Sequence, residues 1–317
     1  MQRKEAPMNK RLYDTVGLRM PITYEELVKV AERLSNIKKH GTCLEGNAKN
    51  FRVILRSKGI YLVGSVATLL YGTNLHTLTN EEIPLAIYKL GEILGLDLFK
   101  AQVVSLDLAQ TYHTRENPAF YFDCLGLHTT LNRHTKIGSL YYGFRTDRRR
   151  ILPKQLCFYD KGAEIKSHGH QIKGDCYLLR YELRLRKQLQ KQLNLERPVT
   201  ADMLMDERFF YSLLRFYQSE YLAIKKEPYY IGVIDLKRTE TPTQTCDLLL
   251  AKLLVDQLQK CPDFLNELYT KVKSYSIYKQ SVYYKRLKER FEDILGKYAF
   301  NEPYDLIKEL DEKILLS

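Results

Sequence analysis

The hydrophobic pattern of the first 100 residues predicts two amphipathic helices. After a loose or strand-like lead-in over residues 1–22, Thr23 and Glu26 have capping-box spacing ahead of the run TYEELVKVAERLSNIKKH, which predicts a helix. Thr79 and Glu82 repeat this spacing ahead of the run EIPLAIYKLGEILGL. The sequence therefore predicts one helix after Thr23 and another after Thr79.

Short runs rich in β-branched and aromatic residues predict an antiparallel sheet. NFRVILRS and GIYLVGS are joined at residues 57–59, which is typical of a hairpin. Further strands are expected in AQVVSLDLAQTYH, AFYFDCL, IGSLYYGFR, KQLCFYD and CYLLRYELRLR. Turn-forming residues separate these runs, and the shortest connections favour antiparallel pairing.

The pattern changes from strands to helices near Pro198. Helical periodicity follows, with candidate helices around residues 201–217, 244–259, 263–273, 281–297 and 303–315. The sequence therefore predicts an α+β fold with two parts, an antiparallel sheet domain over residues 1–197 with flanking helices and a helical C-terminal region over residues 198–317.

Composition points to a protein of the cytoplasm. The chain has 317 residues, no apolar run approaches the roughly 18 residues of a membrane span, and its start lacks the apolar segment of a signal peptide. Its six cysteines are scattered without a CxxC pair, so we expect reduced thiols and neither disulfides nor a zinc site. A membrane partner is not expected.

Positive charge is concentrated in one segment. The formal net charge is +12, and residues 131–191 contain 15 Lys and Arg against 5 Asp and Glu, a local charge of +10. Such a segment is typical of a surface that binds phosphates, which favours a nucleic acid as partner. The candidate DNA contacts are Arg145, Arg148, Arg149, Arg150, Arg180, Arg184 and Arg186.

Asp107 is a candidate metal ligand. Strand alternation places it with Ser105 and Ala109 on one face, where small side chains leave room for a metal ion and a phosphate. The alternative is a solvated or salt-bridged aspartate, which exposed strand faces commonly carry.

Glu182 is the second candidate ligand. Alternation directs the leucines and the tyrosine of LLRYELRLR inward and places Glu182 outward in a row of arginines. Glu182 then holds a metal or acts as a base, while the arginines contact the sugar-phosphate backbone. A cross-strand ladder of salt bridges is the alternative.

Tyr159 is the candidate nucleophile. It follows Leu156 and Phe158 with the opposite parity, so it points away from their face. A phenol with its usual pKa near 10 is a poor nucleophile, and it needs a nearby cation or a phosphate polarised by an ion. Lys161 is placed to supply the cation, and Asp107 with Glu182 to hold the ion. The alternative is an amphipathic tyrosine at a strand end. The SHGH run at residues 167–170 is expected to be a loop and not a metal-binding His pair.

The runs VVSLDLAQT, GSLYYGFRTDRRR, LCFYDKGAEI and LLRYELRLR, in this order, resemble the filamentous-phage replication initiators, the phage/plasmid replication protein II/X family. They are also similar to plasmid rolling-circle initiators. The resemblance covers roughly residues 50 to 190, and FYDKGAEI with RYELRLR is its most specific part.

This resemblance implies a sheet nuclease core of the HUH or Rep-like type that nicks one DNA strand at a replication origin. The tyrosine of the Tyr-x-Lys segment, here Tyr159, becomes attached to the 5′ phosphate, and the free 3′ hydroxyl primes synthesis. Asp107 occupies the place where related nucleases carry metal-binding histidines, and an oxygen-rich site prefers Mg²⁺ or Mn²⁺. Origin DNA is the expected partner, and host helicase and polymerase are candidate partners.

Two other functions compete with a metal-dependent nicking and joining enzyme. A non-catalytic DNA-binding or regulatory protein would use the same basic surface with Tyr159 packed structurally. A mobilisation relaxase would use the same chemistry in another biological role.

Overall fold

The computed structural model describes residues 10–143, 153–167, 169, 177–226, 241–261, 263–274, 281–297 and 306–315. The chain divides into two compact units, Met1–Lys226 together with Asp311–Ser317, and Glu227–Leu310. The first unit contains a large antiparallel sheet, and the described part of the second unit is helical. The predicted α+β class with a helical C-terminal region is confirmed.

One ten-stranded sheet forms the frame of the first unit, and every neighbouring pair in it is antiparallel. Its order is β10 (Asn132–Lys136), β11 (Ser139–Gly143), β12 (Lys154–Asp160), β13 (Tyr177–Leu185), β8 (Gln102–Thr114), β2 (Tyr13–Met20), β6 (Gly59–Ser65), β5 (Phe51–Arg56), β4 (Cys43–Ala48) and β3 (Ser35–His40). The lead-in before Thr23 therefore supplies a central strand. Two short pairs complete the strands, β1 (Lys10–Arg11) with β7 (Leu78–Thr79), and β9 (Leu125–His128) with β14 (Ile224–Lys226).

Most predicted elements of the first unit are confirmed. The hairpin of β5 and β6 closes with Arg56 opposite Gly59. The predicted helix after Thr23 is α1 (Tyr24–Glu32), and both hydrogen bonds of its capping box are present. The predicted helix after Thr79 is α3 (Glu82–Leu94), although its N-cap is Glu81, and the Glu82 carboxylate accepts a hydrogen bond from the Thr79 N–H.

One predicted strand and the predicted end of one helix are wrong. The run AFYFDCL forms α4 (Pro118–Cys124), because the Asn117 side chain caps the helix and Pro118 occupies its first turn. The helix after Thr23 ends at Glu32, and residues 35–40 form β3, because they find a pairing partner in β4.

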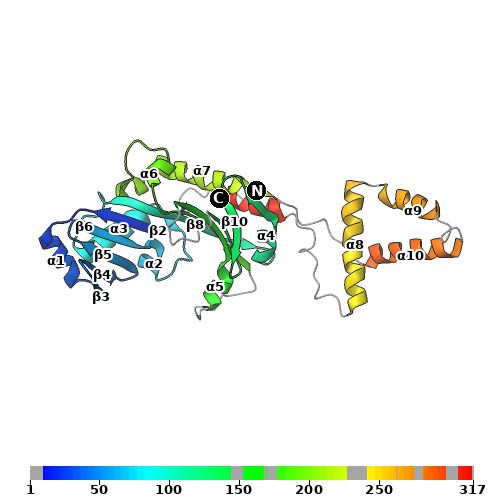
Figure 1. Cartoon of the computed structure of the whole chain (residues 1–317), viewed down its shortest axis with the longest axis horizontal. Coiled ribbons are helices and arrows are strands. Elements are labelled where there is room, and N and C mark those ends of the chain that lie inside the picture. The colour runs from blue at the N-terminus through cyan, green and yellow to red at the C-terminus, as the bar shows by residue number, and fades with distance from the viewer. Residues whose placement is uncertain are drawn as a thin grey trace, which may run out of the picture. The chain divides into compact units, whose positions relative to one another are not determined.

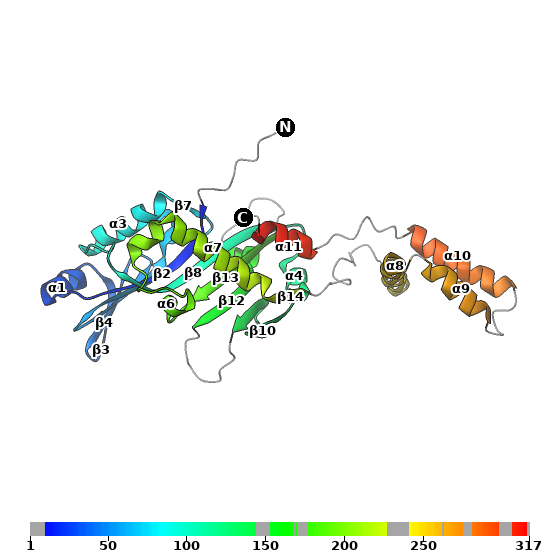
Figure 2. The same ribbon diagram turned by 90° about the horizontal axis from the view of Figure 1, so that it is seen from above.

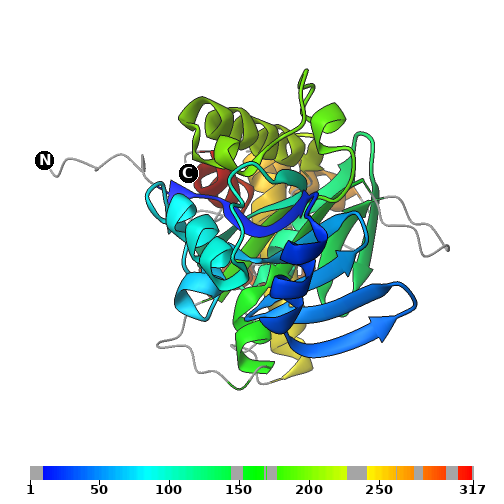
Figure 3. The same cartoon turned by 90° about the vertical axis from the view of Figure 1, so that its left-hand side faces the viewer.

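Helices lie on both sides of the sheet. Figures 1 and 2 show α7 (Glu207–Leu222) running across one face, and Figure 1 shows α2 (Val66–Tyr71) and α5 (Lys161–Ser167) on the opposite side. Figure 3 shows the same layering from the end of the sheet. The short α6 (Leu189–Gln192) and a 3-10 helix (Ala201–Met205) lead into α7. The change of pattern near Pro198 is thus a change from strands to helices within the first unit.

Aromatic rings build the core between the sheet and α7. Phe158 and Tyr181 stack with ring centres 4.5 Å apart, and the ring of Tyr217 on α7 lies 4.3 Å from that of Tyr181. The Tyr217 hydroxyl donates to the carbonyl of Tyr181, and the Tyr181 hydroxyl donates to the carbonyl of Tyr217, at 3.2 and 3.1 Å. This reciprocal pair satisfies both buried phenols and fixes α7 against β13.

The second unit contains α8 (Pro242–Lys260), α9 (Phe264–Ser274) and α10 (Ser281–Lys297). Arg290 of α10 binds both carboxylate oxygens of Asp247 on α8 at 2.6 Å. The last helix, α11 (Leu306–Leu315), returns the chain to the first unit, where the Tyr221 hydroxyl donates to Asp311 at 2.6 Å.

The five cysteines in the described part of the chain are free thiols, as predicted. In the same part, every helix is too short or too polar to cross a lipid bilayer.

Tyr217→Ala should lower the free energy of unfolding by about 3–5 kcal/mol, because it removes a fully buried ring from the contact with the sheet. Tyr217→Phe keeps the ring and loses two hydrogen bonds, to the carbonyl of Tyr181 and with the Tyr112 hydroxyl, so its effect should be about 1–2 kcal/mol. Urea unfolding followed by tyrosine fluorescence measures both variants, since the chain has no tryptophan. Equal effects of the two variants would contradict this packing.

Candidate active site

Polar side chains gather on the face of the sheet that points away from α7. Strands β12, β13, β8 and β2 are neighbours there, with Tyr159 opposite Arg180, Glu182 opposite Ala109, and Arg184 opposite Asp107. The alternation predicted for β13 is correct, since Tyr181 and its neighbouring leucines face the core. However, Arg180 and Glu182 on the other face are 3% and 4% exposed, so this face is covered at its centre.

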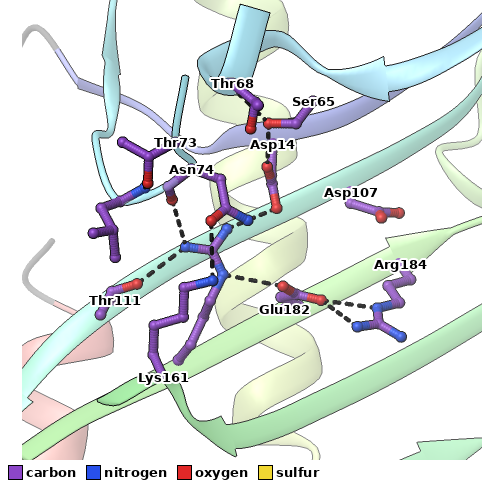
Figure 4. A network of polar contacts seen from close by, with 12 residues as sticks. Asp14, Ser65, Thr68, Thr73, Asn74, Asp107, Thr111, Lys161, Glu182 and Arg184 are labelled. Atoms are coloured by element: carbon purple, nitrogen blue, oxygen red, sulfur yellow. Dashed lines mark hydrogen bonds and ion pairs between the residues drawn. The ribbon is translucent and has the colours of Figure 1, made fainter. Parts of the chain in front are cut away.

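Glu182 is the centre of this cluster (Figure 4). One of its oxygens accepts hydrogen bonds from the Tyr159 hydroxyl at 2.7 Å and from Arg180 Nε at 3.0 Å. The other accepts two from the guanidinium of Arg184, at 2.8 and 2.6 Å. Burial by itself would raise the pKa of Glu182, but Arg184 and Arg180 outweigh it and lower this pKa to about 2. Glu182 is therefore ionised.

Arg180 connects the cluster to a distant part of the chain. Its guanidinium binds Asp14 on β2 at 2.7 Å, Thr111 on β8 at 3.0 Å and the carbonyl of Asn74 at 3.2 Å (Figure 4). Together with the bond to Glu182, these contacts use all three nitrogens of the buried guanidinium. Arg180 is thus a structural cation in this arrangement, as in the salt-bridge alternative, and it does not present the predicted contact to DNA.

Asp107 forms a second ion pair beside the first. One of its oxygens binds Arg186 at 2.7 Å, and the other is buried without a hydrogen-bond partner among the described residues. Burial, with a smaller contribution from the carboxylates of Glu182 and Asp14, raises the pKa of Asp107 to about 7 against the pull of Arg186 and Arg184. Asp107 therefore titrates near neutral pH.

Tyr159 lies at the border between this cluster and solvent. It is half-buried, and burial together with the Glu182 carboxylate raises the pKa of Tyr159 well above its usual value. The phenol is therefore protonated, and it donates a hydrogen bond to the Glu182 carboxylate. The ammonium group of Lys161 lies 5.8 Å from the centre of the Tyr159 ring.

Lys161 is buried and already paired. Its ammonium group binds both oxygens of Glu164 at 3.0 Å and the side chain of Asn74 at 2.9 Å. The predicted cation therefore lies beside Tyr159, but it lies over the ring and not at the hydroxyl, and it is paired with Glu164.

An open hollow of about 610 Å³ gives access to Tyr159. Arg184 and Tyr141 also line this hollow, which we call the Tyr159 hollow. Arg184 has 27% of its side chain exposed. Of the arginines of β13 it is therefore the one placed to meet a phosphate that approaches Tyr159.

The pair Asp107 and Glu182 does not form a ready metal site. Both oxygens of Glu182 are occupied by Arg180, Arg184 and Tyr159, so a metal ion would have to displace a guanidinium group. Asp107 has one oxygen to offer. Within the described ranges, no group of three or more His, Cys, Asp or Glu side chains is arranged to hold a metal ion.

The cluster unites Tyr159, Lys161, Glu182 and Arg184, with Asp107 and Arg186 beside them. The predicted DNA contacts Arg145, Arg148, Arg149 and Arg150 lie outside the described residues, as do His168 and His170 of the SHGH run.

Sequence reasoning missed Asp14 and Asn74. Asp14 is a single carboxylate within a largely apolar run, the signal that singled out Asp107, so it was available in the sequence. Asn74 follows α2 in a loop and has no comparable signal.

Comparison with protein families gives one match. The family model for the N-terminal part of a phage replication-associated protein matches residues 13–203, more than half of the chain and all of the cluster described above. A comparison with curated proteins finds no match.

Glu182→Gln should lower the free energy of unfolding by about 3–5 kcal/mol at pH 7, because it removes the buried carboxylate that Arg180 and Arg184 share and leaves Arg184 without its ion pair. Glu45→Gln is the matched control, since Glu45 pairs with Arg52 at the surface and its loss should have little effect. Urea unfolding measures both.

The effect of Glu182→Gln should depend on pH with a definite sign. The folded pKa of Glu182 is depressed from 4.5 to about 2, so its stabilisation is present above pH 4.5 and is lost as the pH falls toward 2. The difference from wild type should shrink over this range, and a difference that grew with acid would contradict the ion pairs.

Proposed function

Because the chain belongs to the family of phage replication-associated proteins whose N-terminal part the matching model describes, we propose that it initiates rolling-circle DNA replication by nicking and rejoining one strand through Tyr159. The family supports the role of replication initiator and confirms the resemblance to the filamentous-phage proteins. The nuclease core of the HUH or Rep-like type, the tyrosine chemistry and the metal requirement belong to the proposal. Origin DNA is the substrate, a host helicase unwinds the duplex, and a host polymerase extends the new 3′ end.

One observation carries the assignment of Tyr159. Its side chain lines an open hollow, and its hydroxyl donates to an ionised carboxylate at 2.7 Å. Of the other tyrosines on β11 and β13, Tyr142 and Tyr181 are fully buried, Tyr177 is exposed at the start of β13, and Tyr141 lines the same hollow. A nucleophile must reach the phosphate and pass its proton to a base, and the hollow and the Glu182 carboxylate support Tyr159 in this role.

The proposed step exchanges one phosphoester for another. The Tyr159 oxygen attacks phosphorus, a bond forms between them, and the bond from phosphorus to the 3′ oxygen breaks. Glu182 accepts the phenol proton and passes it to the departing 3′ oxygen, so the products are a 5′-phosphotyrosine and a 3′ hydroxyl. Attack by that hydroxyl on the phosphotyrosine rejoins the strand by the reverse path.

Arg184 adjusts the basicity of Glu182 in this proposal. In the resting arrangement its guanidinium binds Glu182 and helps to lower the pKa of that carboxylate. When the guanidinium turns toward the DNA phosphate, Glu182 loses this partner and becomes a stronger base. Binding of the substrate would then itself prepare the proton acceptor.

The proposal predicts that Tyr159→Phe stays folded and binds origin DNA but forms no covalent adduct and no nick. The loss of stability should be about 0.5–1.5 kcal/mol, the value of one hydrogen bond. Tyr141→Phe is the matched control, because it removes a hydroxyl from the same hollow and should keep the adduct. Incubation with supercoiled origin DNA, followed by a denaturing gel and mapping of the phosphotyrosyl peptide, decides between them.

An adduct on Tyr159→Phe would assign the nucleophile to another tyrosine. If wild type formed no adduct with any divalent metal but still bound DNA reversibly, the non-catalytic DNA-binding function would replace the enzyme. An adduct formed at a transfer origin and not at a replication origin would indicate the mobilisation relaxase.

Dependence on Mg²⁺ or Mn²⁺ stays a prediction from the sequence. Asp107 is its best test, because one buried oxygen of this carboxylate has no partner within the described ranges. Asp107→Asn should abolish nicking at every metal concentration and leave DNA binding intact, whereas the exposed control Asp123→Asn should respond to metal like wild type. Wild-type nicking by Asp107→Asn across the titration would remove Asp107 from the site.

A further inference from the structure

A second hollow of about 710 Å³ lies away from the Tyr159 hollow in the same unit. The end of β2, the turn between β5 and β6, and the start of β8 enclose it. Four exposed cations line it, Arg19, Arg56, Lys58 and Lys100, and we call it the basic hollow. Among the described residues that line it there is no Asp or Glu.

The four cations of the basic hollow lack partners within the part of the chain that the structure describes. None of them forms a salt bridge or a side-chain hydrogen bond there, in contrast to Arg180, Arg184 and Arg186, which all bind carboxylates. Unpaired cations around a concave surface attract an anion and leave it room to bind. The basic hollow therefore fits a ligand with several negative charges.

The floor of the basic hollow is apolar and aromatic. Met20, Pro21, Ile54 and Val104 supply aliphatic surface, and Tyr61 adds a half-buried ring. A ligand that matches both parts has phosphates for the rim and flat apolar groups for the floor. Single-stranded DNA has this chemistry, because its unpaired bases can stack on an aromatic ring while its phosphates meet Lys and Arg.

The basic hollow opens on the same face of the sheet as Tyr159. Arg19 is paired with Tyr61 on one side and with Gln102 on the other, and two residues before Arg19 along β2, Gly17 is paired with Ser105. Ser105 precedes Asp107 by two residues, so it shares the face of Asp107 and Arg184.

Gly17 allows Tyr61 and Ser105 to approach each other closely on this face. A Cβ at this position would overlap the Ser105 hydroxyl and would lie 3.3 Å from the Tyr61 hydroxyl. The side chain of Tyr61 thus reaches over β2 toward β8, from the basic hollow toward the candidate active site.

We propose that the basic hollow binds nucleotides of a single DNA strand that lies across this face of the sheet. Four strand spacings, about 19 Å, separate β6, which carries Tyr61, from β12, which carries Tyr159. Tyr61 is in register with Gln102 of β8 and Tyr159 with Thr111, about 30 Å further along that strand, so the two sites lie roughly 35 Å apart. Arg56, Lys58 and their neighbours hold the phosphates, and Tyr61 stacks on a base. The choice of DNA rests on the proposed function, while the location rests on the hollow itself.

The test compares two double variants that each remove two positive charges. Arg56→Ala with Lys58→Ala empties part of the rim, and Lys38→Ala with Lys39→Ala removes two exposed lysines of β3 that do not line the hollow. Fluorescence anisotropy with a labelled 12-nucleotide oligothymidine, and with a duplex of equal length, gives the affinities at several salt concentrations. Thermal unfolding checks that both variants fold.

The rim variant should bind the single strand about tenfold or more weakly and should reduce the slope of log K against log salt by up to about 1.4. The β3 variant should change the affinity less than about twofold. Tyr61→Leu should weaken single-strand binding about fivefold or more with an unchanged salt slope, because stacking involves no counterion release.

Equal losses in the two double variants would overturn the proposal, since general electrostatics would then explain binding. A loss for the duplex as large as that for the single strand would overturn it as well. Lys100→Gln provides an independent rim variant if the double variant fails to fold. The assay needs no nicking, so it is independent of Tyr159. An adduct without single-strand binding contradicts the proposal for the basic hollow. Single-strand binding without an adduct contradicts the assignment of Tyr159 as nucleophile.

Discussion

The ion pairs of Glu182 organise one face of the sheet. A buried carboxylate is tolerated only when partners replace its lost hydration, and Glu182 has four hydrogen bonds, three from arginines and one from Tyr159. Arg180 extends the network to Asp14 on β2. The ion pairs that neutralise Glu182 therefore connect strands from both halves of the sheet. The position of the Tyr159 hydroxyl follows from the need of the buried Glu182 carboxylate for hydrogen-bond donors.

The two faces of the sheet carry different kinds of side chain. Toward α7, the reciprocal hydrogen bonds of Tyr181 and Tyr217 allow large aromatic rings to fill the core without an unsatisfied hydroxyl. On the opposite face, side chains alternate with these residues along β13, so each charged group there is backed by a rigid apolar neighbour. Such support keeps a polar group in a fixed orientation.

Local pattern was sufficient for most strands and for the choice of candidate residues. The alternation in β13 separated Tyr181 from Glu182, and parity separated Phe158 from Tyr159, because a two-residue period follows directly from the backbone. The same rule failed for α4, whose aromatic residues suit a buried helix as well as a strand, although Asn117 and Pro118 marked a helix start.

What the sequence could not supply were the long-range partners. Asp14 is 166 residues from Arg180, and Asn74 is 106 residues from it, so no periodicity relates these groups. Their presence turns a face predicted to be open into one that is covered at its centre. Burial raises the pKa of Asp107 and Tyr159, whereas the arginines outweigh burial at Glu182, so the charge states of all three depend on the three-dimensional arrangement.

The return of α11 to the first unit has a consequence for biosynthesis. Gln218 and Tyr221 on α7 contact residues 311–315, with the Gln218 amide donating to the carbonyls of Ile314 and Leu315. The ribosome must therefore translate the entire inserted unit before these contacts can form, which takes on the order of ten seconds at typical elongation rates. During that interval the nascent sheet unit exposes this end of α7. Formation of these contacts is thus a late event that can only follow synthesis of residues 311–315.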